Sequence, residues 1–108
     1  MQKTPRIEKI SIIIPSYKQE KTIREDIENL KSSLIELPLN YEIIVIIDGN
    51  IDKTFDAIKD LRSKNIKIFM YEKNEGKGFA VKYGMRKANG DVIGFIDAGM
   101  DISPASIS

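Results

Sequence analysis

Residues 74–98 read NEGKGFAVKYGMRKANGDVIGFIDA, and this stretch carries most of the information about the fold. It opens with a glycine-rich turn, in which Gly76 and Gly78 flank Lys77. Glycine tolerates positive φ and lets a ligand approach the backbone closely, while a lysine ammonium offers a point charge to a phosphate. The turn is therefore a candidate anion-binding element. It lacks the spacing of a P-loop and does not complete a dinucleotide-binding G-x-G-x-x-G, because Val81 stands at the sixth position.

A helix with one narrow face follows the turn. Ala80, Gly84 and Ala88 recur at intervals of four, so that small side chains line a face that can lie close to a sheet. Gly90 stands where this helix would end, a position at which a left-handed backbone is usual. The apolar run at 92–96 is too uniform for a half-exposed strand. It predicts a strand covered on both faces of a parallel sheet, with a carboxylate directly after it.

Apolar runs of this kind alternate with amphipathic segments along the rest of the chain, which is typical of repeated βα units. The expected strands cover residues 10–14, 41–47, 66–71 and 92–96. With right-handed crossovers and an open sheet, we expect the strand order 3-2-1-4. The predicted fold class is α/β, a Rossmann-like three-layer βαβαβαβ arrangement with a mostly parallel sheet.

Three helices are expected between these strands. Thr22 and Glu25 have the spacing of a capping box at the start of the first helix, and Pro38 ends it. The apolar stripe of this helix consists of Ile23, Ile27, Leu30 and Leu34. The second helix is expected to start near Asp52 or Thr54, either of which can act as its cap.

Composition limits the classes of protein and of site. The chain has 108 residues, of which 42% are hydrophobic and 31% charged, with a formal net charge of +1. We interpret residues 1–108 as a single domain, and we expect no nucleic-acid partner because no basic excess is present. The sequence contains no histidine or cysteine, so a metal would need oxygen ligands, which favour Mg²⁺ or Mn²⁺. No apolar run is long enough to span a membrane, and we expect a cytoplasmic location.

The expected strand order also predicts where a ligand would bind. In an open α/β sheet, ligands bind beyond the carboxyl ends of the strands, where the strand order reverses. Here that point lies between strands one and four. Pro15, Ser16 and Tyr17 follow the first strand and Asp97 follows the fourth, so we expect them to meet in one crevice. A carboxylate at the end of a buried strand is costly unless a cleft or a partner stabilises it, which favours a functional part for Asp97.

Three segments converge on this crevice, namely residues 12–20 (IIIPSYKQE), residues 47–54 (IDGNIDKT) and residues 76–101. In their order and spacing they resemble the nucleotide-binding half of family 2 glycosyltransferases of the GT-A fold, the group that contains dolichyl-phosphate mannose synthase-like enzymes. The resemblance covers nearly the whole chain. It implies a donor domain that binds a nucleotide-diphospho-sugar, a UDP- or GDP-sugar, with a divalent cation, for transfer of the sugar to an acceptor.

The resemblance also implies roles for particular residues. Pro15, Tyr17 and Glu20 would border the base and ribose of the nucleotide. Asp48 matches a family carboxylate that reads the base or ribose, a task that suits an acceptor facing N–H or O–H donors. Lys77 would lie near the phosphates. Without the resemblance, Asp48 could equally be a turn former, and Pro15 could simply stop strand one.

For the metal, Mg²⁺ or Mn²⁺, the resemblance implies Asp97 and Asp101 as ligands. Asp97 matches the first acid of the family's Asp-x-Asp motif. The second acid usually stands where this chain has Gly99, and Asp101 follows two residues later, from where it could reach the ion directly or through water. Family members ordinarily have two acids at the end of strand two, whereas this chain has one there, because Ile47 precedes Asp48. Either change could weaken the affinity for metal or nucleotide.

The last residues lead to two further expectations. Family members continue beyond the metal motif with acceptor-binding elements and a general base, whereas this sequence stops at Ser108. We therefore expect a fragment of a larger glycosyltransferase with no catalytic residue of its own, incomplete or inactive in isolation, and whether the parent protein is membrane-associated stays open. Strand four would then be an exposed apolar edge, which predicts a homo-oligomer joined near residues 92–96.

Two other classes of function remain open from the sequence. A non-catalytic α/β interaction module could keep the fold and lose the chemistry, and Gly99 together with the missing base favours it. A nucleotidyltransferase is the third alternative, since sugar-nucleotide synthesis uses a related topology. That class would need a longer glycine- and arginine-rich loop after strand one, which residues 16–20 do not supply.

Overall fold

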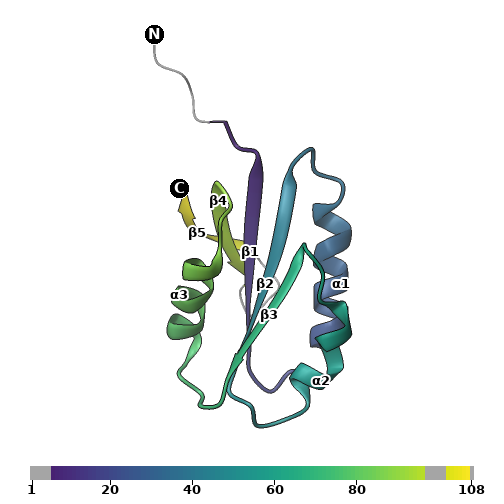
Figure 1. Cartoon of the computed structure of the whole chain (residues 1–108), viewed down its shortest axis with the longest axis vertical. Helices are drawn as coiled ribbons and strands as arrows, with labels where there is room; N and C mark the ends of the chain where they lie inside the picture. The colour runs from purple at the N-terminus through teal and green to yellow at the C-terminus, as the bar shows by residue number, and fades with distance from the viewer. Residues whose placement is uncertain (1–5, 97–101, 108) are drawn as a thin grey trace.

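The computed structural model describes residues 6–96 and the backbone of residues 102–107. Strands and helices alternate along the chain, as Figure 1 shows. In chain order the elements are β1 (Lys9–Ser16), α1 (Ile23–Leu34), β2 (Asn40–Asp48), α2 (Thr54–Ile58), the 3₁₀ turn η1 (Lys59–Leu61), β3 (Ile66–Tyr71), α3 (Lys77–Lys87), β4 (Val92–Ile96) and β5 (Ile102–Ile107). β1 and β2 extend further toward their carboxyl ends than the sequence pattern predicts.

The strands form one sheet in the order β3-β2-β1-β4-β5. β1 pairs in parallel with β2 on one side and with β4 on the other, and β3 continues the parallel set beside β2. The predicted order 3-2-1-4 of the parallel strands is therefore confirmed. Ile13 is the register partner of both Ile44 in β2 and Phe95 in β4, which places β1 in the middle of the sheet.

β5 overturns one prediction from the sequence. It runs antiparallel along β4, and the register extends from Val92 paired with Ile107 to Ile96 paired with Ile102. The prediction of an exposed β4 edge is wrong, and with it the argument for a homo-oligomer joined at residues 92–96. Pro104 stands inside β5, where a proline is tolerated because one side of an edge strand needs no N–H donors.

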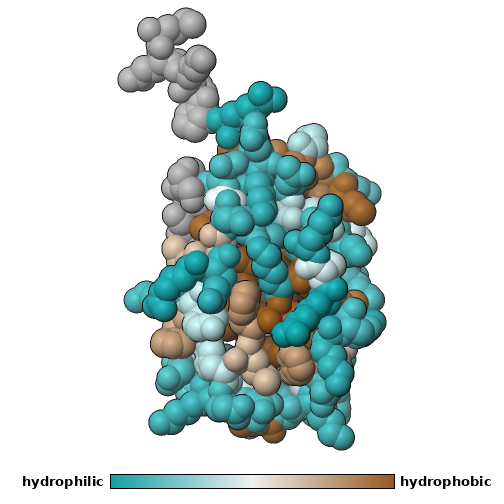
Figure 2. All heavy atoms as spheres, viewed as in Figure 1, coloured by the Kyte–Doolittle hydropathy of each residue, from teal (hydrophilic) through white to brown (hydrophobic). Residues whose placement is uncertain are grey.

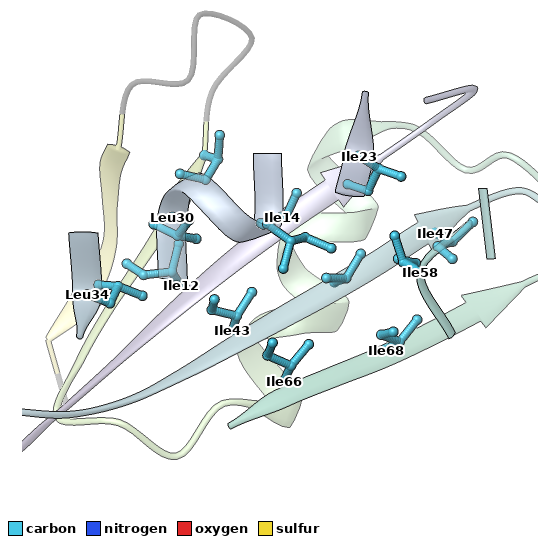
Figure 3. Close-up of a cluster of buried hydrophobic side chains, with 13 residues drawn as sticks. Ile12, Ile14, Ile23, Leu30, Leu34, Ile43, Ile47, Ile58, Ile66 and Ile68 are labelled. Carbon is cyan, nitrogen blue, oxygen red and sulfur yellow. The ribbon is translucent and has the colours of Figure 1, made fainter. Parts of the chain in front are cut away.

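Helices cover both faces of the sheet, α1 and α2 on one side and α3 on the other (Figure 1). The larger core lies under α1 and α2, and Figure 3 shows Ile12 of β1 beside Leu30 and Leu34 of α1. The predicted apolar stripe of α1 is buried, and it consists of Ile23, Ile27, Leu30 and Leu34. Burying a side chain of this size stabilises the fold by about 1.5–3 kcal/mol, so the stripe holds α1 against the sheet.

The smaller core lies under α3, where Ala80 and Gly84 are the buried helix residues. A Cβ added to Gly84 would lie 2.6 Å from Cγ2 of Ile13, so the helix can approach β1 this closely only because a glycine stands there. The narrow face expected from the spacing is thus a packing face. In the view of Figure 2 the surface is mostly polar, with apolar residues gathered along the middle between α3 and α1.

Two expected helix ends differ in detail. Thr22 precedes α1, but its side chain makes no capping hydrogen bond, and its backbone N–H donates instead to the Gln19 carbonyl at 3.1 Å. Gly90 does not have a left-handed backbone, since Gly49 and Gly76 are the glycines with positive φ among the described residues. An added Cβ at Gly90 would lie 2.5 Å from the Ser11 hydroxyl oxygen, so close approach rather than φ requires glycine there.

No helix within residues 6–96 has the length and the apolar surface that crossing a bilayer would require.

Candidate functional site

A cavity of about 620 Å³ opens at the carboxyl ends of β1, β2 and β4. Four of the residues predicted for the site line it, and they are Pro15, Tyr17, Asp48 and Lys77. They come from three separate segments of the chain, which the parallel sheet gathers at one edge because the strands point the same way. The size suits a small-molecule ligand.

The other predicted residues are not all in this cavity. Glu20 lines a neighbouring hollow of about 280 Å³ together with Lys18, Ile51 and Asp52. Asp97 and Asp101 lie outside the described residues. Ile96, the last residue of β4, does line the main cavity, so the strand that precedes Asp97 leads to it.

The loop between β1 and α1 forms one wall and is braced by the first residue of α2. The backbone N–H of Gln19 donates to the Thr54 hydroxyl at 3.2 Å, and Thr54 is only 1% exposed. Asp52 accepts hydrogen bonds from both the backbone N–H and the hydroxyl of Thr54, the first residue of α2. The N-cap position of α2 is Lys53, whose side chain makes no capping hydrogen bond, so neither Asp52 nor Thr54 is the N-cap that the sequence suggests. Tyr17 on this wall is 43% exposed, so its ring has a face available to a ligand.

Asp48 lies at the base of the cavity, where β2 ends, and is only 3% exposed. Its Oδ1 accepts a hydrogen bond from the Glu75 backbone N–H at 2.8 Å. Its Oδ2 accepts two more, from the Asn74 side-chain amide at 2.8 Å and from the Gly76 backbone N–H at 3.0 Å. The carboxylate is therefore bound to the loop that connects β3 to α3.

The side chain of Tyr71 adjoins this carboxylate, because Tyr71 is the register partner of Asp48 at the ends of β3 and β2. The hydroxyl oxygen is buried, with no partner at hydrogen-bond geometry among the described residues. Burial and the neighbouring Asp48 carboxylate raise the pKa of Tyr71, so the phenol stays neutral. Its ring packs edge-on against Phe79 of α3 at a centroid distance of 5.3 Å.

The turn before α3 has the conformation that its glycines allow. Gly76 has φ 97° and ψ 162°, a region that only glycine adopts without strain. Gly78 does not need this freedom, because it lies within α3 and its φ is not positive. Lys77 is the first residue of the helix, and its Nζ lies 5.3 Å from the centroid of the Phe95 ring in β4. The ammonium therefore stands between the turn and the end of β4.

Sequence reasoning missed some residues of the cavity wall, among them Asn74, Gln19, Thr22 and Asp26. Asp26 is partly buried in the first turn of α1, and burial, followed by the nearby Glu25, raises the pKa of its carboxyl group. Its place one residue before the buried Ile27 gave no signal of function, because a carboxylate in the first turn of a helix is ordinarily explained by the helix dipole.

The family follows from a comparison with known sequences. The model of the family described as Glycosyl transferase family 2 matches residues 11–106, which is nearly the whole chain. This chain belongs to glycosyl transferase family 2. The family predicted from the three segments around the cavity is thereby confirmed.

Individual proteins of known sequence or structure are also similar to this chain. A dolichol-phosphate mannosyltransferase of Pyrococcus furiosus is 34% identical over 100 residues, covering 92% of this chain and 28% of the relative. A mannosyltransferase of Pyrobaculum calidifontis, solved in complex with GDP-Man and Mn²⁺, has a TM-score of 0.65 at 22% identity, covering 88% of this chain and 28% of that one.

A second similar structure is glucosyl-3-phosphoglycerate synthase of Mycobacterium tuberculosis in complex with Mn²⁺, UDP and glucosyl-3-phosphoglycerate, with a TM-score of 0.64 at 24% identity. The similarity covers 84% of this chain and 33% of that one. At these identities the two structures show the fold, which is that of GT-A glycosyltransferases. This family 2 chain spans about a third or less of the length of the proteins that it matches.

Proposed function

We propose that this chain is the part of a family 2 glycosyltransferase that binds a nucleotide-diphospho-sugar, UDP- or GDP-linked, with a divalent cation. The observation that carries the proposal is the shared cavity, which joins an exposed aromatic side chain, a lysine ammonium and a glycine turn at the switch point of the sheet. A nucleotide diphosphate has a flat base, which the aromatic side chain complements, and a charged diphosphate, which the lysine and the glycine turn complement. Similar structures solved with GDP-Man or UDP support the choice of ligand.

Within the proposed site, Pro15 and Tyr17 border the base and ribose from the wall of the β1–α1 loop. Glu20, which lines the neighbouring hollow, would approach the same part of the ligand from there. Lys77 lies at the diphosphate, where its ammonium and the first N–H groups of α3 favour negative charge. The leaving group would be stabilised by the same interactions as charge develops on it.

For the cation we propose Asp97 and Asp101 as the protein ligands. Two carboxylates are the donor set that Mg²⁺ and Mn²⁺ accept, and Mg²⁺ commonly keeps several waters and needs few protein ligands. Within residues 6–96 there is no group of three acidic side chains that could hold such an ion instead. When bound, the cation would offset charge on the diphosphate.

Nucleotide binding can be tested by thermal unfolding of the chain with UDP or GDP, in the presence and absence of Mn²⁺. We expect Tm to rise with nucleotide concentration, and to rise further with Mn²⁺, because a ligand that binds the folded state stabilises it. Uridine and guanosine, which lack phosphates, should give little shift, and Lys77→Ala should reduce the shift with the diphosphates.

A chain whose Tm stays constant with both diphosphates up to millimolar concentration would refute the proposal. The non-catalytic interaction module is the alternative class, and membership of family 2 does not favour it. Turnover of a sugar nucleotide, including simple hydrolysis, would reject that alternative.

A further inference from the structure

The β3–α3 loop has to cross the end of β2 before it reaches the cavity. It leaves β3 after Tyr71, whose register partner is Asp48, and enters α3 at Lys77. The crossing is close, because a Cβ added to Gly49 would lie 3.3 Å from the Asn74 backbone nitrogen, and Gly49 has φ 109°. The geometry of the loop is therefore imposed by the end of β2.

Asp48 is the group at the end of β2 that binds this loop. Its two oxygens accept hydrogen bonds from three consecutive residues, Asn74, Glu75 and Gly76. The Asn74 amide also donates to the Asp48 main-chain carbonyl at 3.2 Å, which adds a second link between the same residues. Backbone N–H groups that converge on one carboxylate are oriented by it, since hydrogen bonds to a charged acceptor are short and strong.

We infer that Asp48 is a positioning residue, which sets the turn before α3 and thereby aims Lys77 and the first N–H groups of the helix into the cavity. The inference rests on the proposed function, and it departs from the expectation of the sequence resemblance that Asp48 reads the base or ribose directly. At 3% exposure the carboxylate has little surface left for a ligand. Gly76, which it holds, is a glycine with many accessible conformations, and the hydrogen bond to Asp48 favours the one with φ 97°.

Hydrogen exchange tests the positioning without any nucleotide. In Asp48→Asn, an amide N–H faces the backbone donors, so we expect the Glu75 and Gly76 amides to exchange at least about tenfold faster, as for groups released from a bond. The amides of Ile44 and Val45 in the middle of β2 should keep their rates. Unchanged exchange at Glu75 and Gly76 would overturn the inference. Should this variant not fold, Asn74→Ala tests the same link with Asp48 in place.

Asp91→Asn is the matched control. Asp91 also accepts hydrogen bonds from two backbone N–H groups, those of Glu8 at 2.8 Å and Lys9 at 3.0 Å, but it lies outside the cavity lining. Its variant should lose stability and keep both nucleotide affinity and the exchange rates of Glu75 and Gly76. A merely structural part for Asp48 would give the same pattern in Asp48→Asn, namely lower stability with unchanged affinity.

Nucleotide affinity then separates positioning from base reading. We expect Asp48→Asn to weaken the binding of UDP and of GDP by the same factor, about tenfold. In a Lys77→Ala background it should weaken binding little further, because both changes remove the same interaction. A loss confined to one base, or effects of the two variants that multiply fully, would overturn the inference. A wild-type chain that binds no nucleotide would refute the proposed function, and the exchange rates would still decide how the turn is held.

Discussion

Gly84 shows how much a single residue of this chain decides. It lies on the face of α3 that packs against β1, and Ile13 beneath it is fully buried and branched at Cβ. A β-branched side chain in a packed core changes its rotamer only at a considerable cost in free energy, because its neighbours fill the space around it. The distance between α3 and the sheet therefore depends on the missing methyl group.

We predict that Gly84→Ala lowers the free energy of unfolding by about 1–2 kcal/mol, since the strain of overpacking exceeds the gain in helix propensity. Chemical denaturation measures the difference. Gly78→Ala is the matched control, because Gly78 is an exposed residue of the same helix with no atom within 4 Å of an added Cβ. It should leave stability unchanged or raise it by up to about 1 kcal/mol. Equal effects of the two substitutions would contradict the packing argument.

Among the elements, β5 has the clearest consequence. It pairs with the whole of β4, whose interior is apolar and whose free edge would otherwise present unpaired N–H and C=O groups. An exposed edge of this kind can pair with a strand of another molecule. In this protein β5 pairs with the edge of β4 within the same molecule.

We predict that a chain ending after residue 101 is less stable and associates with itself, because removal of β5 exposes the β4 edge. Sedimentation velocity over a range of concentrations measures the association, with the full chain as the control. Substitution of the partly buried Val92 by lysine in the shortened chain should reduce the association, since charged side chains protect a sheet edge. A shortened chain that sediments like the full one at high concentration would show that β5 does not serve this purpose.

At the scale of the whole molecule, one buried carboxylate links strands from both ends of the sequence. Glu42 in β2 is fully buried, and it accepts hydrogen bonds from Ser11 at 2.6 Å, from the Lys67 ammonium at 2.8 Å and from the Asn89 backbone N–H at 2.8 Å. Burial alone would raise the pKa of Glu42, but the Asn89 N–H and the side-chain donors outweigh it and lower this pKa. The anion is therefore the form that the fold stabilises.

The stability that Glu42 contributes should depend on pH. Because its pKa is lower in the folded chain than the ordinary 4.5, the contribution is complete above about pH 4.5 and is lost as the pH falls below that value. We predict that Glu42→Gln lowers the free energy of unfolding by about 3 kcal/mol at pH 7, and that the difference from wild type shrinks toward pH 3. Urea denaturation between pH 7 and pH 3 measures both effects.

Asp60→Asn is the control for this pH series. Asp60 pairs with Arg24 at 2.7 Å, but both side chains are exposed, so water and salt screen the pair and the substitution should change stability little. If Glu42→Gln followed the wild-type curve at every pH, the buried network would not be the acid-sensitive part of the fold.

Much of the fold could be predicted because its signals are local. The stripe of α1 repeats within a few residues, and the strand order follows from the handedness of βα crossovers once the strands are identified. The site could be predicted in part by the same argument, since Tyr17, Asp48 and Lys77 each follow or end a recognisable element and their strands are parallel. β5 gave no such signal, because a short segment with a proline does not show the pattern of a strand.

The sequence by itself determined the family, the α/β class and the edge of the sheet at which the site lies, because periodicity, glycine spacing and chain direction act over short distances. Only the tertiary structure decided what Asp48 binds, why residue 90 must be glycine and that β4 has a second partner, β5. Asp48 meets residues 26 to 28 positions away, and the Gly90 N–H meets Ser11 across 79 positions. Contacts of this kind depend on how packed elements bring distant segments together, which no local pattern encodes.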